Sequence, residues 1–282
     1  SGTDAATVIQ QALNNLTSGR TWKEKVVLKG EFEIEKMITL PSYIHIMIDG
    51  QLKVKSGANV TIFFASDKSH IEIEGGVLDG NYPNNTSGNL ISICGDYEDL
   101  HIHDMILKNA PVSAINLDSL EATKTMKNIL IENCKFYDIP SNAIPCNGVA
   151  ENLRIQNCHF ERTTGILRYA IQILDTRGPS KGIWIVNNKI IKPYVYPIRV
   201  KGCSEIHIIG NYIEGVPEYY TDADSGGTAD MISLHSCKNF EIIGNKCYQS
   251  GDMGITIEEG CEEGSIVGNK IWLADAMGIT IE

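Results

Sequence analysis

One eight-residue pattern recurs through the second half of the chain, and it constrains the possible folds more than any other feature of the sequence. Its six clearest copies align without gaps and begin at Ile129, Leu153, Ile183, Ile206, Phe240 and Gly264. Successive copies start 24, 30, 23, 34 and 24 residues apart, and looser copies begin at Ile71 and Leu100. A unit of this length with two or three short strands cannot close a core alone, but stacked units can share one. The period therefore predicts a right-handed, single-stranded parallel β-helix.

The rest of the chain fits one all-β domain, residues 1–282, that is built on this repeat. Short apolar segments continue through residues 26–282 and correspond to about ten coils at this period. Residues 3–16 carry apolar side chains at helical spacing, so we expect one α-helix that covers the open N-terminal end of the stack. Residues 278–282 repeat residues 254–258. The chain thus stops inside a coil, which suggests a domain truncated at its C-terminus.

One column of the aligned repeats holds an amide side chain in four coils, at Asn188, Asn211, Asn245 and Asn269. Stacked coils would place these amides above one another at about 4.8 Å, where they can hydrogen-bond along the stack as an asparagine ladder. Five of the eight cysteines also fall in stacking columns, and none forms a Cys-x2-Cys pair. We expect buried free thiols that act as small core residues, with a disulfide left open as the alternative.

The overall charge argues against two classes of partner. The chain carries 24 Lys and Arg against 35 Asp and Glu, a formal net charge of −11 at pH 7. Nucleic acids and anionic membrane surfaces both bind basic footprints. The apolar runs are also far shorter than the roughly 20 residues of a membrane-spanning helix. We therefore expect neither a nucleic acid nor a membrane as a partner.

Several segments resemble a known superfamily. They are residues 3–16, 25–34, 73–80, 107–111 and Arg199-Val200-Lys201, together with the ladder repeats. On these segments the chain resembles the pectate lyase superfamily, and it is most similar to the polygalacturonase-like glycoside hydrolases. The resemblance implies a groove along one sheet that binds acidic polysaccharide and aspartates that hydrolyse it. It also implies that Arg199 and Lys201 bind a sugar carboxylate. The usual catalytic aspartate pair of that family is missing, because residues 141–144 read Ser-Asn-Ala-Ile.

The repeat also predicts which side chains face the groove. In the strand that begins each coil, alternate side chains point outward, and adjacent coils bring the charged outward positions together. The candidate catalytic residues of this cluster are Asp230, Asp252, Glu258, His235 and Lys201. The candidate substrate-binding residues around it are Arg199, Arg168, Tyr169, Tyr196, Gln172, Tyr219 and Tyr220. The last two lie in the longest insertion, residues 215–229, and long loops on a repeat scaffold often carry function.

Three functions remain open for this cluster. A glycoside hydrolase would use its three carboxyl groups as acid, base or nucleophile, provided that two of them lie at the separations that glycosidases use. A polysaccharide lyase would act by β-elimination on uronates, with Lys201, His235 or Arg199 as the base. A non-catalytic β-helix, tailspike-like or a surface carbohydrate-binding module, would need no chemistry, and the charges could then form an ordinary surface ion network.

The sequence predicts no cofactor, and it assigns no metal ligand to the candidate site. Asp222 and Asp224, in the long insertion, could bind Ca²⁺ through hard oxygen ligands, but ordinary surface aspartates show the same spacing. The resemblance implies a polysaccharide as the partner. It also implies an extracellular or virion-associated location and either a monomer or a homotrimer.

Overall fold

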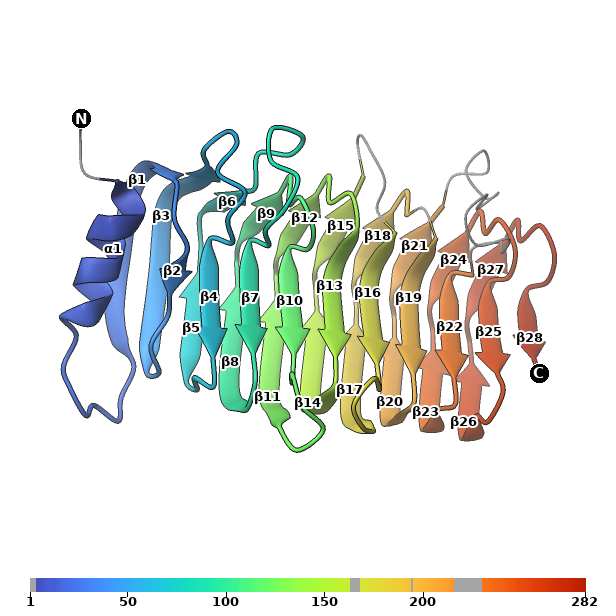
Figure 1. The fold of residues 1–282 in the computed structure, drawn as a ribbon. Helices are drawn as coiled ribbons and strands as arrows, with labels where there is room; N and C mark the ends of the chain where they lie inside the picture. The colour runs from blue at the N-terminus through green and yellow to red at the C-terminus, as the bar shows by residue number, and fades with distance from the viewer. Residues whose placement is uncertain (1–3, 163–167, 194, 216–229) are drawn as a thin grey trace.

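The computed structural model describes residues 4–162, 168–193, 195–215 and 230–282. These residues form an elongated stack of turns that begins at the helix α1 (Ala5–Asn14) and ends at the strand β28 (Ile279–Ile281), as Figure 1 shows. Strands of successive turns pair in parallel from one end of the stack to the other. The predicted all-β parallel β-helix is confirmed.

One sheet receives a single strand from each turn and has ten strands. In chain order they are β2 (Ile38–Thr39), β4 (Phe63–Ser66), β7 (Ile91–Cys94), β10 (Ile115–Asp118), β13 (Asn142–Asn147), β16 (Tyr169–Leu174), β19 (Tyr196–Lys201), β22 (Ile232–His235), β25 (Ile255–Glu258) and β28.

The other sheet has eighteen strands in two rows. The first row holds β1 (Glu24–Ile34), β3 (Ile44–Val54), β5 (Ile71–Glu74), β8 (Tyr97–His103), β11 (Thr125–Glu132), β14 (Val149–Gln156), β17 (Ser180–Val186), β20 (Cys203–Ile209), β23 (Lys238–Ile243) and β26 (Glu262–Val267). The second row holds β6 (Val77–Asp79), β9 (Ile106–Lys108), β12 (Lys135–Tyr137), β15 (His159–Glu161), β18 (Lys189–Ile191), β21 (Tyr212–Glu214), β24 (Lys246–Tyr248) and β27 (Lys270–Trp272).

The number of complete turns is slightly smaller than the ten expected. Within the described residues, eight turns contain all three strands, from β4, β5 and β6 to β25, β26 and β27. At the N-terminal end, the long β3 pairs with both β5 and β6 and so takes the place of two strands. At the other end, β28 is the single strand that follows the last complete turn.

Alternation of side chains explains why these short segments share one core. In β16, Ile171 and Ile173 point into the stack and are fully buried, and β19 places Ile198 and Val200 at the matching positions. Branched and aromatic side chains fit a pleated surface that is buried on one face. Stacking such turns buries a continuous apolar column that no single turn could form.

The helix α1 lies at the N-terminal end of the stack, as the sequence predicts (Figure 1). The Asp4 side chain accepts hydrogen bonds from the backbone N–H groups of Ala6 and Thr7, which caps the helix. The apolar face of α1 buries Ile9 and Leu13 and packs against β1 and β2. Among the described residues, no helix is long and apolar enough to cross a membrane.

The asparagine ladder is present in four consecutive turns. Nδ2 of Asn188 donates to Oδ1 of Asn211 at 3.1 Å, and the next two steps, to Asn245 and then to Asn269, measure 2.9 Å each. Each Nδ2 also donates to a backbone carbonyl of the preceding turn. Buried amides are tolerated when all their polar atoms are hydrogen-bonded, so the ladder fixes the vertical alignment of these turns.

All eight cysteines are free thiols, and seven of them are buried. Cys158 occupies the ladder column one turn earlier, and its Sγ donates to the carbonyl of Ile131 at 3.8 Å, as the ladder amides do to theirs. Cys203, Cys237 and Cys261 form a separate cysteine column. In it, the backbone N–H of Cys237 donates to Sγ of Cys261 at 3.3 Å. Burial raises the pKa of the Cys237 thiol to about 12. The prediction of buried free thiols is confirmed, and the disulfide alternative was wrong.

A second column explains how the chain turns between the two rows of the eighteen-stranded sheet. The residue before each ladder position has a positive φ: 54° at Asn133, Asn157 and Asn187, 67° at Gly210, and 65° at Gly244 and Gly268. Glycine adopts this backbone region without steric cost, and asparagine tolerates it better than other residues. The repeat therefore carries Asn or Gly there because of backbone geometry.

The connections that lead into the ten-stranded sheet differ most in length. Four residues separate β18 from β19 and six separate β24 from β25, whereas seventeen separate β21 from β22. Those that the structure describes lie along the upper edge of the stack in Figure 1. The insertion of seventeen residues at this corner produces the longest spacing of the repeats, 34 residues, and the five residues between β16 and β17, at another corner, contribute to the spacing of 30. The strand register is unchanged by either.

Candidate functional site

The outer face of the ten-stranded sheet carries the rows of side chains that the repeat predicts. Strand register aligns Gln172, Arg199, Ser233 and Thr256 in one row. It aligns Leu174, Lys201, His235 and Glu258 in the neighbouring row. Because paired strands lie about 4.8 Å apart, side chains in one row face each other closely. The four turns from β16 to β25 therefore form the candidate site.

Two tyrosines and an arginine form a flat platform on this face. The rings of Tyr169 and Tyr196 are stacked, with centroids 5.9 Å apart and an interplanar angle of 10°. Cζ of Arg199 lies 5.0 Å from the centroid of the Tyr196 ring. Nε of Arg199 is buried and has no hydrogen-bond partner among the described residues. The two tyrosines are half-buried, so their exposed parts can contact a sugar, and the guanidinium can bind an anion beside them.

Asp230 is a buried acid at the edge of this platform. It lies just before β22, is only 5% exposed, and its Oδ1 finds no hydrogen-bond partner in the described part of the chain. Burial is the main reason that the pKa of Asp230 is raised to about 6, and the carboxylates of Asp252 and Glu258 raise it further. Hydrogen bonds from Thr256 and the Met253 backbone lower it in part. A carboxyl group of this kind can hold a proton near neutral pH and donate it.

The acids and the platform belong to one cluster. Burial raises the pKa of Tyr196, the carboxylates of Asp230 and Glu258 raise it further, and Arg199 lowers it. Such electrostatic effects require short separations. Glu258 is held in place by Ser233, whose hydroxyl donates to Oε1 at 3.1 Å. Asp230, Glu258 and Arg199 therefore all act on Tyr196.

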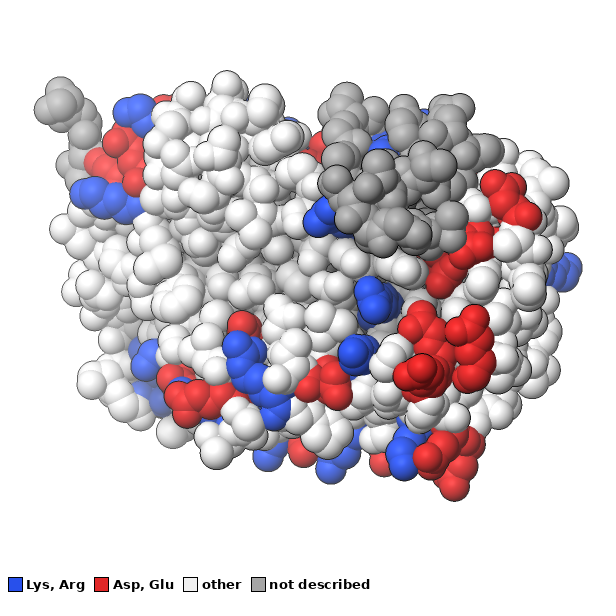
Figure 2. All heavy atoms as spheres, turned by 45° about the vertical axis from the view of Figure 1, so that its right-hand side comes forward, with Lys and Arg blue, Asp and Glu red and all other residues white. Residues whose placement is uncertain are grey.

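The basic members of the cluster form no direct ion pair with two of its acids in the part of the chain that the structure describes. Among the described residues, neither Arg199 nor Lys201 forms an ion pair with Asp230 or Glu258. His235 hydrogen-bonds to the hydroxyl of Ser236, with 2.8 Å between Nδ1 and Oγ. Figure 2 shows basic side chains beside a group of acidic ones on this side of the molecule. The surface ion network considered from the sequence thus does not explain Arg199 and Lys201.

The remaining predicted residues differ in how well they are placed. Gln172 is nearly buried, and its Oε1 accepts a hydrogen bond from Nδ2 of Asn142 at 3.0 Å. Arg168 directly precedes β16 and is exposed, and its carbonyl accepts the backbone N–H of Tyr196. Tyr219 and Tyr220 lie outside the described residues, as do the two aspartates considered for Ca²⁺.

Sequence reasoning missed a second cluster, on the outer side of the eighteen-stranded sheet. Glu72, His101 and His103 each place one potential metal-ligand atom within 4.8 Å of the others, and His45, Glu72 and Glu74 do the same. The sequence signal was a His-x-His pair at 101–103 that follows a Glu-x-Glu pair at 72–74 by 29 residues, one turn of the stack.

The fold is shared with solved β-helix proteins whose activities differ. The A-module of mannuronan C-5 epimerase from Azotobacter vinelandii matches with a TM-score of 0.63 and 12% identity, over 99% of this chain and 94% of that chain. Polygalacturonase from Erwinia carotovora ssp. carotovora matches with a TM-score of 0.56 and 12% identity, over 99% and 94%. A surface adhesin of Streptococcus pneumoniae matches with a TM-score of 0.56 and 14% identity, over 98% and 90%.

These likenesses confirm the predicted parallel β-helix fold. At 12–14% identity they do not extend to the activity. No protein-family model and no curated protein sequence matches the chain.

Proposed function

We propose that this chain is a glycoside hydrolase that binds an acidic polysaccharide along the outer face of the ten-stranded sheet and cleaves it. The observation that carries the proposal is Asp230, a buried acid with a pKa of about 6 that lies beside two further carboxyl groups. Glycosidases require such a pair, with one carboxyl group protonated and the other ionised.

In the proposed reaction, Asp230 is the general acid. It gives its proton to the glycosidic oxygen as the bond to the sugar carbon breaks, so that the leaving sugar departs with a new hydroxyl group. Asp252 or Glu258, in ionised form, either activates the attacking water or attacks the sugar itself and is later released by water. The first route inverts the configuration at the sugar carbon and the second retains it, so product stereochemistry identifies the role of the second carboxylate.

The substrate class is inferred from the basic side chains of the same face. Arg199 presents a guanidinium that lies over the ring of Tyr196 and forms no ion pair with Asp230 or Glu258 among the described residues. A uronate carboxylate can bind such a group through paired hydrogen bonds. Lys201 and Arg168 extend the positive charge along the face.

The similar structures support a carbohydrate role. A polygalacturonase and a mannuronan epimerase are named for polysaccharide substrates, and the third protein is a surface adhesin. A polysaccharide partner fits the two enzyme names, and an extracellular location fits the surface adhesin. The variety of these proteins also means that cleavage itself must be tested.

The test is a panel of acidic and neutral polysaccharides, followed by reducing ends and by the ultraviolet absorbance of unsaturated uronates. Hydrolysis produces reducing ends without absorbance, and Asp230→Asn should lower the rate by about 10²–10⁴-fold, the usual contribution of a general acid. Glu259→Gln, an exposed acid next to Glu258, is the matched control and should keep full activity.

Two other results would replace the proposal. A lyase would produce the ultraviolet absorbance of an unsaturated uronate. Its activity would be lost in Lys201→Ala or His235→Ala and kept in Asp230→Asn. Saturable binding without any cleavage across the panel would indicate a carbohydrate-binding β-helix.

A further inference from the structure

The strongest feature that the proposed function does not use is the histidine and glutamate cluster on the eighteen-stranded sheet. We propose that Glu72, His101 and His103 bind one divalent transition-metal ion, for which Zn²⁺ is the probe. This site lies on β5 and β8, near the N-terminal end of the stack, whereas the candidate hydrolase site lies on β16 to β25 of the other sheet (Figure 1).

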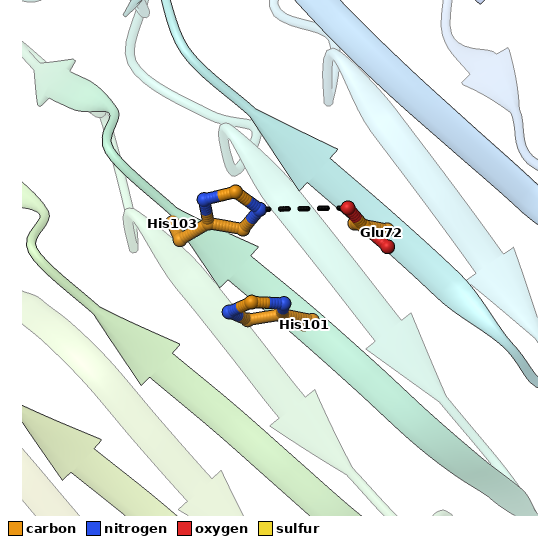
Figure 3. Close-up of side chains that lie close together, drawn as sticks. All are labelled: Glu72, His101 and His103. Carbon is orange, nitrogen blue, oxygen red and sulfur yellow. Dashed lines mark ion pairs between the residues drawn. The ribbon is translucent and has the colours of Figure 1, made fainter. Parts of the chain in front are cut away.

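Strand register brings the three side chains to one face. Glu72 in β5 pairs directly with His101 in β8, and His103 follows two residues later on the same face. Nε2 of His103 lies 3.6 Å from Oε1 of Glu72, as Figure 3 shows. Ligand atoms of a tetrahedral zinc ion, each about 2.0–2.1 Å from the metal, lie roughly 3.4 Å apart. The observed spacing therefore leaves room for an ion between these atoms.

Each histidine is already oriented by a carboxylate. Nδ1 of His103 lies 2.8 Å from Oδ2 of Asp104, and Nε2 of His101 lies 3.0 Å from Oε1 of Glu132. A carboxylate holds the nitrogen that it contacts in the N–H form, so the lone pair of a neutral ring is on the other nitrogen. Carboxylate, histidine and metal in series are the usual arrangement around protein-bound zinc.

The free nitrogen of His103 is an exception to normal hydrogen bonding. Its Nε2 is buried and has no hydrogen-bond partner among the described residues. A buried nitrogen whose lone pair faces a carboxylate is unfavourable unless a cation lies between them. The two rings are also stacked, with centroids 4.0 Å apart, which restricts their rotation. The cluster is thus preorganised to hold a cation.

The surrounding charges leave one oxygen of Glu72 for the ion. Nζ of Lys23 lies 3.3 Å from Oε2, whereas Oε1 faces His103. Oε1 also lies 3.4 Å from Nε2 of His45, and that nitrogen lies 2.9 Å from Oε1 of Glu74. The competing explanation is that His45 and His103 are protonated and form an ion network with Glu72 and Glu74. Metal titration distinguishes the two explanations.

Untagged protein is treated with a chelator, dialysed, and titrated with ZnCl2 by calorimetry at neutral pH. We expect one Zn²⁺ per chain. His103→Gln and Glu72→Gln should each weaken binding by more than about 100-fold, since each removes a ligand. Asp104→Asn should weaken it about 10–100-fold, the usual effect of losing the carboxylate that orients a histidine ligand.

The matched control is His207→Gln. His207 lies on the same sheet, its Nδ1 is 2.9 Å from Oε2 of Glu241, and its ring stacks on Trp184, but it belongs to neither metal-ligand group. Its substitution should leave Zn²⁺ affinity unchanged. Replacing Zn²⁺ by Co²⁺ adds an independent readout, because visible absorption reports histidine coordination, and circular dichroism verifies that each variant is folded.

Three outcomes would overturn the proposal. Absence of saturable Zn²⁺ binding would favour the protonated ion network. Unchanged affinity in both His103→Gln and Glu72→Gln would place the ion elsewhere. Loss of binding in His45→Gln with full binding in His101→Gln and His103→Gln would assign it to the group of His45, Glu72 and Glu74.

Discussion

Replacement of Asp230 by asparagine should stabilise the protein above about pH 6 while it removes activity. The pKa of Asp230 rises from an ordinary 3.8 to about 6 in the folded protein, mainly because of burial. The folded state therefore holds this proton more tightly than the unfolded state does. The proton on Asp230 makes its full contribution to the free energy of unfolding below about pH 4. This contribution is lost as the pH rises through about 6.

The magnitude follows from the size of the shift. A shift of about two pKa units, at 1.36 kcal/mol each, corresponds to roughly 3 kcal/mol. At pH 8 the ionised Asp230 carboxyl therefore destabilises the folded protein by about this amount. An asparagine carries no charge and avoids this cost. Its carbonyl can accept from Thr256 as the carboxyl does, and its NH2 group would occupy the position of the unpartnered Oδ1.

The assay is urea denaturation of the wild type and Asp230→Asn at about pH 8 and at about pH 4. We expect the variant to be more stable by up to about 3 kcal/mol at the higher pH and equal at the lower. Glu259→Gln, an exposed neighbour, should change the free energy of unfolding by less than about 0.5 kcal/mol at either pH. A variant that is less stable than the wild type at pH 8, or equally stabilised at both values, would refute the reasoning.

Three further predictions follow from the same structure. If Asp230 is the general acid, kcat/KM should decline as the pH rises through about 6, because the proton is lost, and a rate independent of pH between about 5 and 8 would contradict that role. Asn211→Ala should lower the free energy of unfolding by about 3 kcal/mol in chemical denaturation, since the neighbouring ladder groups lose buried partners, whereas Asn84→Ala, at the exposed amide pair with Asn81, should cost less than about 1 kcal/mol. Tyr196→Ala should weaken polysaccharide binding about tenfold in calorimetry through loss of the platform, and unchanged affinity would remove the platform from the site.

The fold could be predicted because different aligned positions of the repeat meet different physical requirements, each with its own residue type. Asparagine in the ladder column, Asn or Gly at the left-handed corner, and branched apolar residues at inward positions each have one structural reason. Aligning these columns also fixes the strand register, so the rows that contain Arg199 and Lys201 were correct. The number of turns was slightly too high because the long β3 replaces two strands, which the period does not reveal.

The chemical state of the site could not be predicted in the same way. The register places Ser233 beside Thr256 on adjacent strands, but Asp230 lies just before β22, outside the aligned rows, so the repeat does not predict its burial. The cluster of His101 and His103 was missed for a different reason. Those residues were assigned only to a copy of the repeat, although Glu72 stands one turn earlier in the direct neighbouring position.

The corner where connections vary in length has a consequence for how such a protein can change. Strands, ladder and core stay in place whether four or seventeen residues enter the ten-stranded sheet. A segment exchanged at one turn would thus alter the rim of the groove without requiring compensating changes in the turns above and below. Recombination of short segments, in nature or in the laboratory, could therefore retarget the surface one turn at a time while the scaffold is inherited unchanged.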